Sequence, residues 1–257
     1  MSVERQTIDR LIGTWSIVQL AKGHRFSTDD LVTAWRASMA RPDAERLLDI
    51  GSGVGSVGLS TLYRMGPTAT LTMIEAQPIS TELARQTMTL NHLDERVTVL
   101  DGDLRDPGVL PEGETFDLVT GSPPYIPLGT GLLSPHPQRA ACRIELRGSV
   151  YDYCVAAKRW LAPGGRFAFV MLSADPRTEA APIEAGLRVV ERWDYVFGAR
   201  REPHVATLVC GHAEEDLPER VTGQLVIRGP DGQWTAEYAS FRREMGAIVP
   251  AGDIPGA

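Results

Sequence analysis

The feature that most constrains the fold is a glycine-rich turn between a strand pattern and a helical pattern. The segment ERLLDIG (45–51) has the apolar run of a buried strand, and VGSVGLSTLYRMG (54–66) has helical spacing. Gly51, Gly53 and Gly55 lie at this junction, where glycine allows the backbone to turn tightly and to approach a ligand closely. The segment therefore predicts a strand, a ligand-binding loop and a helix.

Strand and helix patterns alternate from Arg46 onward, which predicts an α/β fold with a parallel sheet and helices on both faces. Further strands are expected in ATLTMIEA, RVTVLDGD, FDLVTGSPPY and GRFAFVML. A proline-glycine turn at 162–165 is expected to introduce the last of these. After Gly186, the patterns LRVVERWDYVFG and HVATLVCG follow each other without a helix between them. This pair predicts an antiparallel hairpin at the sheet edge.

The length of 257 residues suits one domain with a full core. We expect residues 46–257 to form this domain with a C-terminal extension, and residues 1–45 to form a separate N-terminal segment. The chain has no run of about 18 apolar residues and no apolar signal segment, so we expect a cytoplasmic protein that does not cross a membrane. Cys142, Cys154 and Cys210 lie far apart, which favours free thiols and no metal.

The net charge of −7 does not exclude a nucleic-acid partner, because binding depends on the local field. Residues 121–210 carry 11 basic and 8 acidic side chains. Within them, Arg139, Arg143 and Arg147 recur at intervals of four and would share one face of a helix. Arg200 and Arg201 form a second basic cluster in the expected hairpin turn. These five arginines are the candidate contacts to RNA phosphates.

The glycine loop also matches the G-x-G-x-x-G pattern of dinucleotide-binding proteins, through Gly53, Gly55 and Gly58. An acidic residue at the preceding strand end argues against that alternative, because Asp49 would repel a pyrophosphate.

Acidic residues end three of the expected strands. Asp49 precedes the glycine loop, Glu75 ends the next strand, and Asp103 follows the third. Glu75 has the spacing of a carboxylate that binds ribose hydroxyls, and Asp103 is placed to accept a hydrogen bond from an adenine amine. S-adenosylmethionine is a cation without phosphate and suits such an acidic ring. We therefore expect it as the cofactor.

The fourth strand ends in Ser122-Pro123-Pro124-Tyr125. Two prolines make a rigid turn without amide donors, so the carbonyls of Ser122 and Pro123 can accept hydrogen bonds from a substrate amine. Such bonds favour a pyramidal nitrogen whose lone pair faces the methyl group, and positioning supplies much of the catalysis. Tyr125 would stack on a planar target. The target base should be unpaired or flipped out.

The Ser-Pro-Pro-Tyr motif, and the order in which it follows the glycine loop, resemble the amino-methyltransferases with the signature (Asn/Asp/Ser)-Pro-Pro-(Tyr/Phe/Trp). Within them the chain is similar to the bacterial enzymes that methylate the adenine-N6 amine of valine tRNA, through GHRFSTDDLVTAW, GSPPYIP and LVIRGPDGQWTAEY. The resemblance implies a Rossmann-like, seven-stranded class I methyltransferase sheet, with residues 1–45 as a cap closing over the cofactor. It also implies that the segment Phe26–Asp30 closes over the methionine end of the cofactor. It implies an S-adenosylmethionine site made of Phe26, Thr28, Asp29, Asp49, Gly51, Gly53, Gly55, Glu75, Asp103 and Leu104.

The tRNA enzymes normally have Asn where this chain has Ser122. Ser-Pro-Pro-Tyr is common in enzymes that methylate the N4 amine of cytosine in DNA, and Pro-Pro-Tyr-Ile-Pro resembles enzymes that methylate a glutamine in release factors. Only about 45 residues precede the strand that leads into the glycine loop. This length argues against the separate N-terminal helical domain that the glutamine enzymes carry. A small-molecule substrate and an inactive RNA-binding module are further alternatives; intact Asp49, Glu75 and Tyr125 argue against lost activity.

Overall fold

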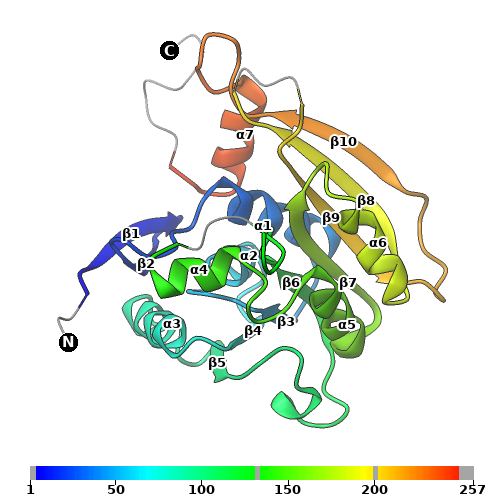
Figure 1. The fold of residues 1–257 in the computed structure, drawn as a ribbon, viewed down its shortest axis with the longest axis horizontal. Coiled ribbons are helices and arrows are strands. Elements are labelled where there is room, and N and C mark those ends of the chain that lie inside the picture. Colours follow the sequence, from blue (N-terminus) through cyan, green and yellow to red (C-terminus); the bar gives the residue numbers. More distant parts are fainter. Residues whose placement is uncertain (1–3, 131–133, 199–201, 249–257) are drawn as a thin grey trace.

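The computed structural model describes residues 4–130, 134–198 and 202–248 of the chain. Within these ranges the main sheet has eight strands in the order β10-β8-β9-β7-β6-β3-β4-β5 (Figure 1). The strands are β3 (Arg46–Ile50), β4 (Thr70–Glu75), β5 (Val97–Asp101), β6 (Phe116–Gly121), β7 (Leu161–Leu172), β8 (Leu187–Val196), β9 (Val205–His212) and β10 (Val221–Val226).

The predicted parallel α/β sheet is confirmed. Strand β3 pairs in parallel with β4 and β6, β4 pairs with β5, and β6 pairs with β7. The predicted antiparallel pair is also present, because β9 runs antiparallel to both β7 and β8. The pair does not form the sheet edge, however, because the additional strand β10 pairs in parallel with the outer side of β8. The sheet therefore has eight strands within the described ranges instead of the expected seven. Most residues of β10 are exposed, and the segment has no apolar run like those of the buried strands, so the sequence pattern did not predict it.

The turn expected at 162–165 lies inside β7 as an irregularity. Leu161 pairs with Phe116, and the next pair along the ladder is Arg166 with Leu118. The proline and glycines therefore interrupt the pairing of one long strand instead of preceding a shorter one.

The helices lie on both faces of the sheet. They are α1 (Thr28–Ala40), α2 (Ser56–Arg64), α3 (Pro78–Leu90), α4 (Pro137–Arg143), α5 (Val150–Trp160), α6 (Arg177–Glu184) and α7 (Ala236–Glu244), with a 3-10 turn at Pro107–Val109. Alternate strand residues enter two cores, as Leu47 packs with the α1, α2 and α3 side and Leu48 with the α5 and α6 side. None of the helices in the described ranges is long and apolar enough to cross a bilayer.

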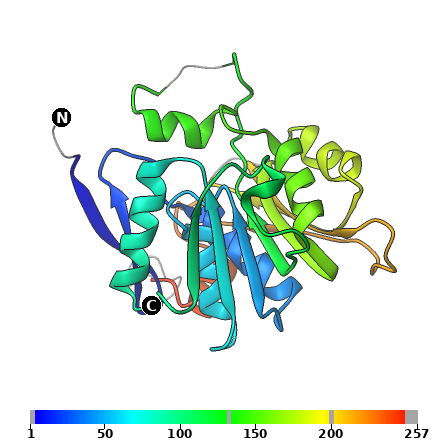
Figure 2. The ribbon, with the colours of Figure 1, turned by 90° about the horizontal axis from the view of Figure 1, so that it is seen from below.

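The segments at the two chain ends pack on the helical face that contains α1, α2 and α3. A hairpin of β1 (Gln6–Ile12) and β2 (Trp15–Leu20) lies beside α3 (Figure 2), with the Ser16 amide donating to Asn91 Oδ1 at 2.8 Å. Helix α7 packs on α1, where the rings of Trp35 and Phe241 are 4.6 Å apart. At the start of α1, the Thr28 hydroxyl lies 3.2 Å from the Tyr238 hydroxyl of α7.

Candidate functional site

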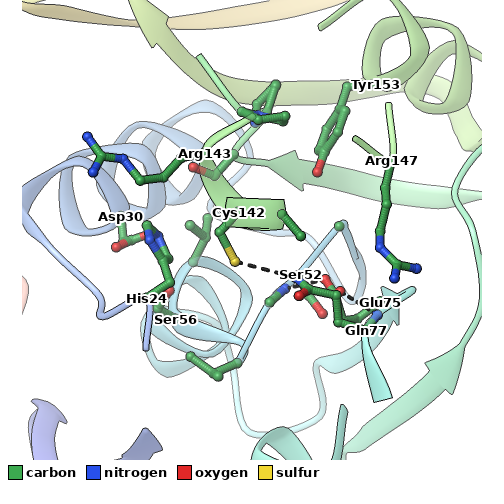
Figure 3. A pocket seen from close by; sticks show the side chains of 18 of the residues that line it. His24, Asp30, Ser52, Ser56, Glu75, Gln77, Cys142, Arg143, Arg147 and Tyr153 are labelled. Carbon is green, nitrogen blue, oxygen red and sulfur yellow. Dashed lines mark hydrogen bonds between the residues drawn. The ribbon is translucent and has the colours of Figure 1, made fainter. Parts of the chain in front are cut away.

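A cavity of about 430 Å³ lies at the carboxyl ends of β3, β4, β5 and β6, partly covered by α4 (Figure 3). Parallel strands bring the loops that follow them to one edge of the sheet. The lining contains most of the residues predicted from sequence: Phe26, Asp29, Asp49, Gly51, Gly53, Glu75, Asp103, Leu104, Ser122, Pro123, Pro124, Tyr125, Arg143 and Arg147. Thr28, Gly55 and Arg139 are not part of the lining. Arg200 and Arg201 lie outside the described residues.

The glycine loop has backbone conformations that require glycine. Gly51 has φ +59°, and a Cβ at this position would lie 1.9 Å from the hydroxyl oxygen of Tyr153. Gly53 has φ +57° and open space where a Cβ would project. Gly55, at φ +90°, is the N-cap of α2 and does not line the cavity. Gly51 therefore fits against Tyr153, whereas Gly53 leaves its backbone open to a ligand.

Asp49 is buried at the end of β3, with 1% of its surface exposed. Its Oδ1 accepts the Thr120 hydroxyl at 2.8 Å, and its Oδ2 accepts the Gly58 amide at 3.0 Å. Burial raises its pKa to about 7, against the lowering effect of these two hydrogen bonds. A carboxyl with this pKa gains a negative charge most readily when a cation enters the cavity.

Glu75 is buried at the end of β4 and connects two loops. Its Oε2 accepts the Gly53 amide at 2.8 Å, and its Oε1 accepts the Gln77 amide at 2.7 Å. Burial raises the pKa of Glu75, while these amides act in the opposite direction. Each carboxylate oxygen keeps a further lone pair, so Glu75 can also accept hydrogen bonds from the hydroxyls of a ligand.

Asp103 lies two residues beyond β5 and differs from the other two acidic residues. The guanidinium of Arg105 donates to both of its oxygens, from Nε at 2.9 Å and from Nη2 at 2.6 Å. These bonds lower the pKa of Asp103. The carboxylate therefore stays ionised and still has lone pairs for a ligand amine.

The lining fits a cationic ligand with polar groups. The carboxyl groups of Asp49, Glu75 and Asp103 surround it, and the buried hydroxyl of Ser52 has no hydrogen-bond partner within the described part of the chain. An unpaired buried hydroxyl is costly, and a bound ligand or water would remove that cost. The space beside Gly53 admits the ligand close to the backbone. These properties match S-adenosylmethionine, which is cationic and carries hydroxyl and amine groups.

The Ser122–Tyr125 motif begins directly after β6 and lines the same cavity. Pro123 and Pro124 are buried, and neither has an amide hydrogen. Among the described residues, the Ser122 side chain makes no hydrogen bond, so its hydroxyl is available to a substrate. The Tyr125 hydroxyl donates to Asp29 Oδ2 at 3.0 Å. The motif therefore presents oxygen atoms and one fixed ring next to the carboxylate-lined part of the cavity.

Helix α4 and the residues after it form a roof over the cavity, which we define as residues 137–147. Gln138 Oε1 accepts the His24 amide at 3.1 Å, so the roof contacts the segment that precedes α1. On its other side, Gln77 Nε2 donates to Cys142 Sγ at 3.5 Å (Figure 3), and Arg147 Nη1 donates to the Ala76 carbonyl at 3.1 Å. The roof thus joins segments far apart in the sequence.

The expectation that three arginines share one helical face is wrong. Helix α4 ends at Arg143 because the chain becomes extended at Ile144, so Arg147 lies in the following loop. Arg139 donates to the Gly23 carbonyl at 3.1 Å from Nη2. Arg143 is exposed at the cavity and has no carboxylate partner among the described residues. The three side chains therefore have different surroundings.

Asp30, at the end of the expected Phe26–Asp30 segment, also lines the cavity, whereas the sequence did not predict the lining residues Gln77, Gln138, Cys142, Tyr153 and His204. Asp30 had a local signal, because Ser27 and Asp30 have the spacing of a helix capping box, which the structure contains. The others reach the cavity through tertiary contacts without a local motif.

The three cysteines are free thiols, as expected. Burial raises the pKa of Cys142 to about 12, so this thiol in the roof stays protonated and is a poor nucleophile. Among the residues that the structure describes, no group of three His, Cys, Asp or Glu side chains has the arrangement of a metal site.

Comparison with known proteins gives a consistent result. The family model described as the methyltransferase small domain matches residues 9–130. A tRNA1(Val) (adenine(37)-N6)-methyltransferase from a Flavobacteriaceae bacterium is 27% identical over 74% of this chain and 78% of its own length. The relative of the same description from Aeromonas hydrophila is 28% identical over 76% of this chain and 80% of its own.

A solved structure from Agrobacterium tumefaciens, described as a predicted O-methyltransferase, superposes with a TM-score of 0.59. It covers 87% of this chain and 100% of its own at 18% identity, a level that shows the shared fold. Fold, family model and relatives agree on one class of enzyme.

Proposed function

This chain is a class I S-adenosylmethionine-dependent methyltransferase, and we propose that it methylates the N6 amine of an unpaired adenine in tRNA. One observation carries the proposal: the Ser122–Tyr125 motif and the carboxyl groups of Asp49, Glu75 and Asp103 line a single cavity. When bound, S-adenosylmethionine supplies a methyl group on a positively charged sulfur. The protein has to hold that methyl group in line with a nitrogen lone pair.

The carboxylate-lined part of the cavity holds the cofactor in this proposal. Glu75 accepts the ribose hydroxyls, because its oxygens keep free lone pairs beside the bonds from Gly53 and Gln77. Asp103 accepts the adenine amine, with Leu104 packing beside it. Asp49 compensates the positive charge of the cofactor from below the glycine loop.

Residues 1–45 close the cavity at the methionine end of the cofactor. Phe26 and Asp29 line the cavity there, and the Phe26 amide is fixed by Gln19 Oε1 at 2.8 Å. Thr28 does not face the cavity but contacts the C-terminal extension, with its hydroxyl 3.2 Å from the Tyr238 hydroxyl. This support from α7 holds the closing segment in place.

The motif activates the amine by positioning it. The Pro123 carbonyl accepts one amine hydrogen and Ser122, through its hydroxyl or its carbonyl, accepts the other, which favours a pyramidal nitrogen. Ser122 and Pro123 would thereby present the nitrogen lone pair to the methyl group of S-adenosylmethionine. Transfer would break the sulfur–methyl bond, leave the neutral thioether S-adenosylhomocysteine, and release one amine proton to water. No strong base is needed at this step, and the protonated thiol of Cys142 takes no part.

Tyr125 stacks on the target in this proposal, which restricts the substrate to a planar group. A paired base within a helix cannot enter the cavity, so the target is a base in a loop or one that has been flipped out. The relatives are described as methyltransferases that act on adenine in tRNA, which favours tRNA over DNA as the substrate. Arg143 at the cavity mouth supplies a cation for the backbone phosphates that flank the base.

Ser122 favours one second candidate, the N4 amine of cytosine. Its side chain is shorter than the Asn of the tRNA enzymes, so an amine bound by its hydroxyl must lie closer to the motif. Cytosine and adenine carry equivalent exocyclic amines on rings of different size. The space above the Tyr125 ring therefore determines whether adenine or cytosine binds.

The experiment is to incubate the purified chain with methyl-labelled S-adenosylmethionine and, separately, with unmodified tRNA, DNA and cell protein. The proposal predicts label in tRNA, and loss of the label in Tyr125→Ala, with cofactor binding retained. Label in DNA or protein would refute tRNA as the substrate. Full labelling of tRNA by Tyr125→Ala would refute the stacking role.

A further inference from the structure

The side chain of Asp29, in the first turn of α1, connects this helix to the Ser122–Tyr125 motif. Its Oδ2 accepts the Tyr125 hydroxyl at 3.0 Å, and its Oδ1 accepts the Ser27 hydroxyl at 2.7 Å. Both carboxylate oxygens thus have a donor within the protein. A carboxylate with both oxygens in use is fixed in orientation and can itself fix the group that donates to it.

Tyr125 is also held at its backbone. Arg177 Nη2 donates to the Tyr125 carbonyl at 3.4 Å, and Arg177 is itself anchored by Asp175 Oδ2 at 2.6 Å and by Glu145. Burial raises the pKa of the Tyr125 phenol well above its usual value, and Asp29 acts in the same direction. The hydroxyl therefore remains a donor, and the ring is anchored at both ends.

The carboxyl group of Asp30, the next residue in α1, has a different role. Asp30 Oδ2 accepts the Ser27 amide at 2.7 Å and completes the cap of α1, and the Ser56 side chain at the start of α2 acts to lower the pKa of Asp30. Asp30 is thus directed toward the glycine loop, whereas Asp29 is directed toward Tyr125. Asp30 thus faces the part of the cavity proposed for the cofactor, and Asp29 faces the part proposed for the substrate.

We propose that Asp29 is a positioning residue for the methyl acceptor, which acts by holding the ring of Tyr125 at the angle required for stacking. This inference rests on the stacking role in the proposed function, but it does not depend on which planar amine is methylated. It extends the role expected from resemblance, in which the segment Phe26–Asp30 serves the cofactor.

The test is a double-mutant cycle measured on whichever polymer the wild-type chain labels. Tyr125→Phe keeps the ring and removes its hydroxyl, and Asp29→Ala removes the acceptor. Each is expected to lower kcat about tenfold, as for the loss of a hydrogen bond to a charged group. The double variant is expected to be no slower than either single one, and Asp29→Asn, which keeps an acceptor oxygen, should retain most of the turnover.

A double variant about 100-fold slower than wild type would overturn the inference, because the two residues would then act independently. Asp29→Ala with normal kcat and a raised KM for S-adenosylmethionine alone would also overturn it. Thermal melting of each variant excludes loss of folding as the cause, and Tyr125→Phe leaves Asp29 in place should Asp29→Ala prove unstable.

A crystal structure of Asp29→Ala supplies a readout that does not need a substrate. The inference predicts that the Tyr125 ring leaves its wild-type position, whereas an unmoved ring would refute it. If the wild-type chain labelled no tRNA, the proposed substrate would be wrong, and the position of the ring would still decide the role of Asp29.

Discussion

The Gly53 amide donates to Glu75 Oε2 at 2.8 Å, and this bond joins the glycine loop after β3 to the acidic end of β4. The same carboxylate accepts the Gln77 amide at 2.7 Å. Glu75 therefore shapes the loop on which the cofactor lies, in addition to any contact with the cofactor itself.

Glu75→Gln is expected to weaken S-adenosylmethionine binding at least tenfold. The side-chain amide of Gln has one acceptor oxygen, so its nitrogen would face either the Gly53 or the Gln77 amide, donor against donor. Isothermal titration calorimetry measures the affinity. Glu82→Gln, on the outer side of α3, is the matched control. Unchanged affinity in Glu75→Gln would remove Glu75 from the cofactor site.

Gly51→Ala is expected to be more harmful than Gly53→Ala. Both positions have φ near +60°, so both substitutions strain the backbone by about 1–2 kcal/mol. Only at Gly51 does the new methyl group also meet a buried side chain, 1.9 Å from the Tyr153 hydroxyl oxygen. Gly51→Ala should therefore lose about 1–3 kcal/mol more of the free energy of unfolding. Urea denaturation compares the two variants, and equal losses would contradict the packing described for Tyr153.

The stability of the cofactor-free protein should fall as pH rises. Asp49 has a pKa of about 7 in the folded chain, against its ordinary 3.8. Between these values the folded state binds more protons than the unfolded state, so the free energy of unfolding decreases from about pH 4 to about pH 7. Asp30, with a pKa also raised to about 7, contributes in the same direction.

Asp49→Asn removes one of these groups and should make the decrease shallower. Asn carries an acceptor for the Gly58 amide and a donor for Thr120, so the local contacts can persist. Urea denaturation across the pH window measures the slope, with Asp43→Asn as a control for loss of an exposed carboxylate. Parallel curves for wild type and Asp49→Asn would contradict the raised pKa.

Arg143→Ala is expected to weaken tRNA binding and to reduce the salt dependence of the dissociation constant. One phosphate contact to single-stranded RNA contributes about 0.7 to the slope of log K against log salt. Arg46→Ala is the control, because Arg46 lies at the amino end of β3, away from the cavity, and pairs with Glu114. Fluorescence anisotropy at several salt concentrations gives both slopes. An unchanged slope in Arg143→Ala would exclude this arginine from the RNA contact.

Sequence patterns predicted the central fold because each buried strand leaves a local signal. The apolar runs at β3 and β6 and the glycine turn after β3 are local features. Strand β10 has no such run, since its exposed residues depend on pairing with β8 for their structure. The end of α4 at Arg143 was also missed, because the spacing of arginines continues where the helix does not.

The sequence predicted a site residue where the same segment also contains the local pattern that indicates the role of that residue. Asp49, Glu75 and Ser122 lie at the carboxyl ends of three adjacent parallel strands, β3, β4 and β6, which places them at one edge of the sheet. Tyr153 and Gln138 could not be found in this way, because they line the cavity through contacts with Gly51 and His24 that only the folded chain creates.

The most direct test of the proposed activity is to identify the methylated unit. tRNA labelled by the purified chain is digested to nucleosides, and the labelled nucleoside is identified by its mass and by comparison with synthetic standards. The proposal predicts N6-methyladenosine. Label in N4-methylcytidine would show that Ser122 selects the smaller ring, and label found only in protein would show that the acceptor is not a nucleic acid; either result contradicts adenine as the target.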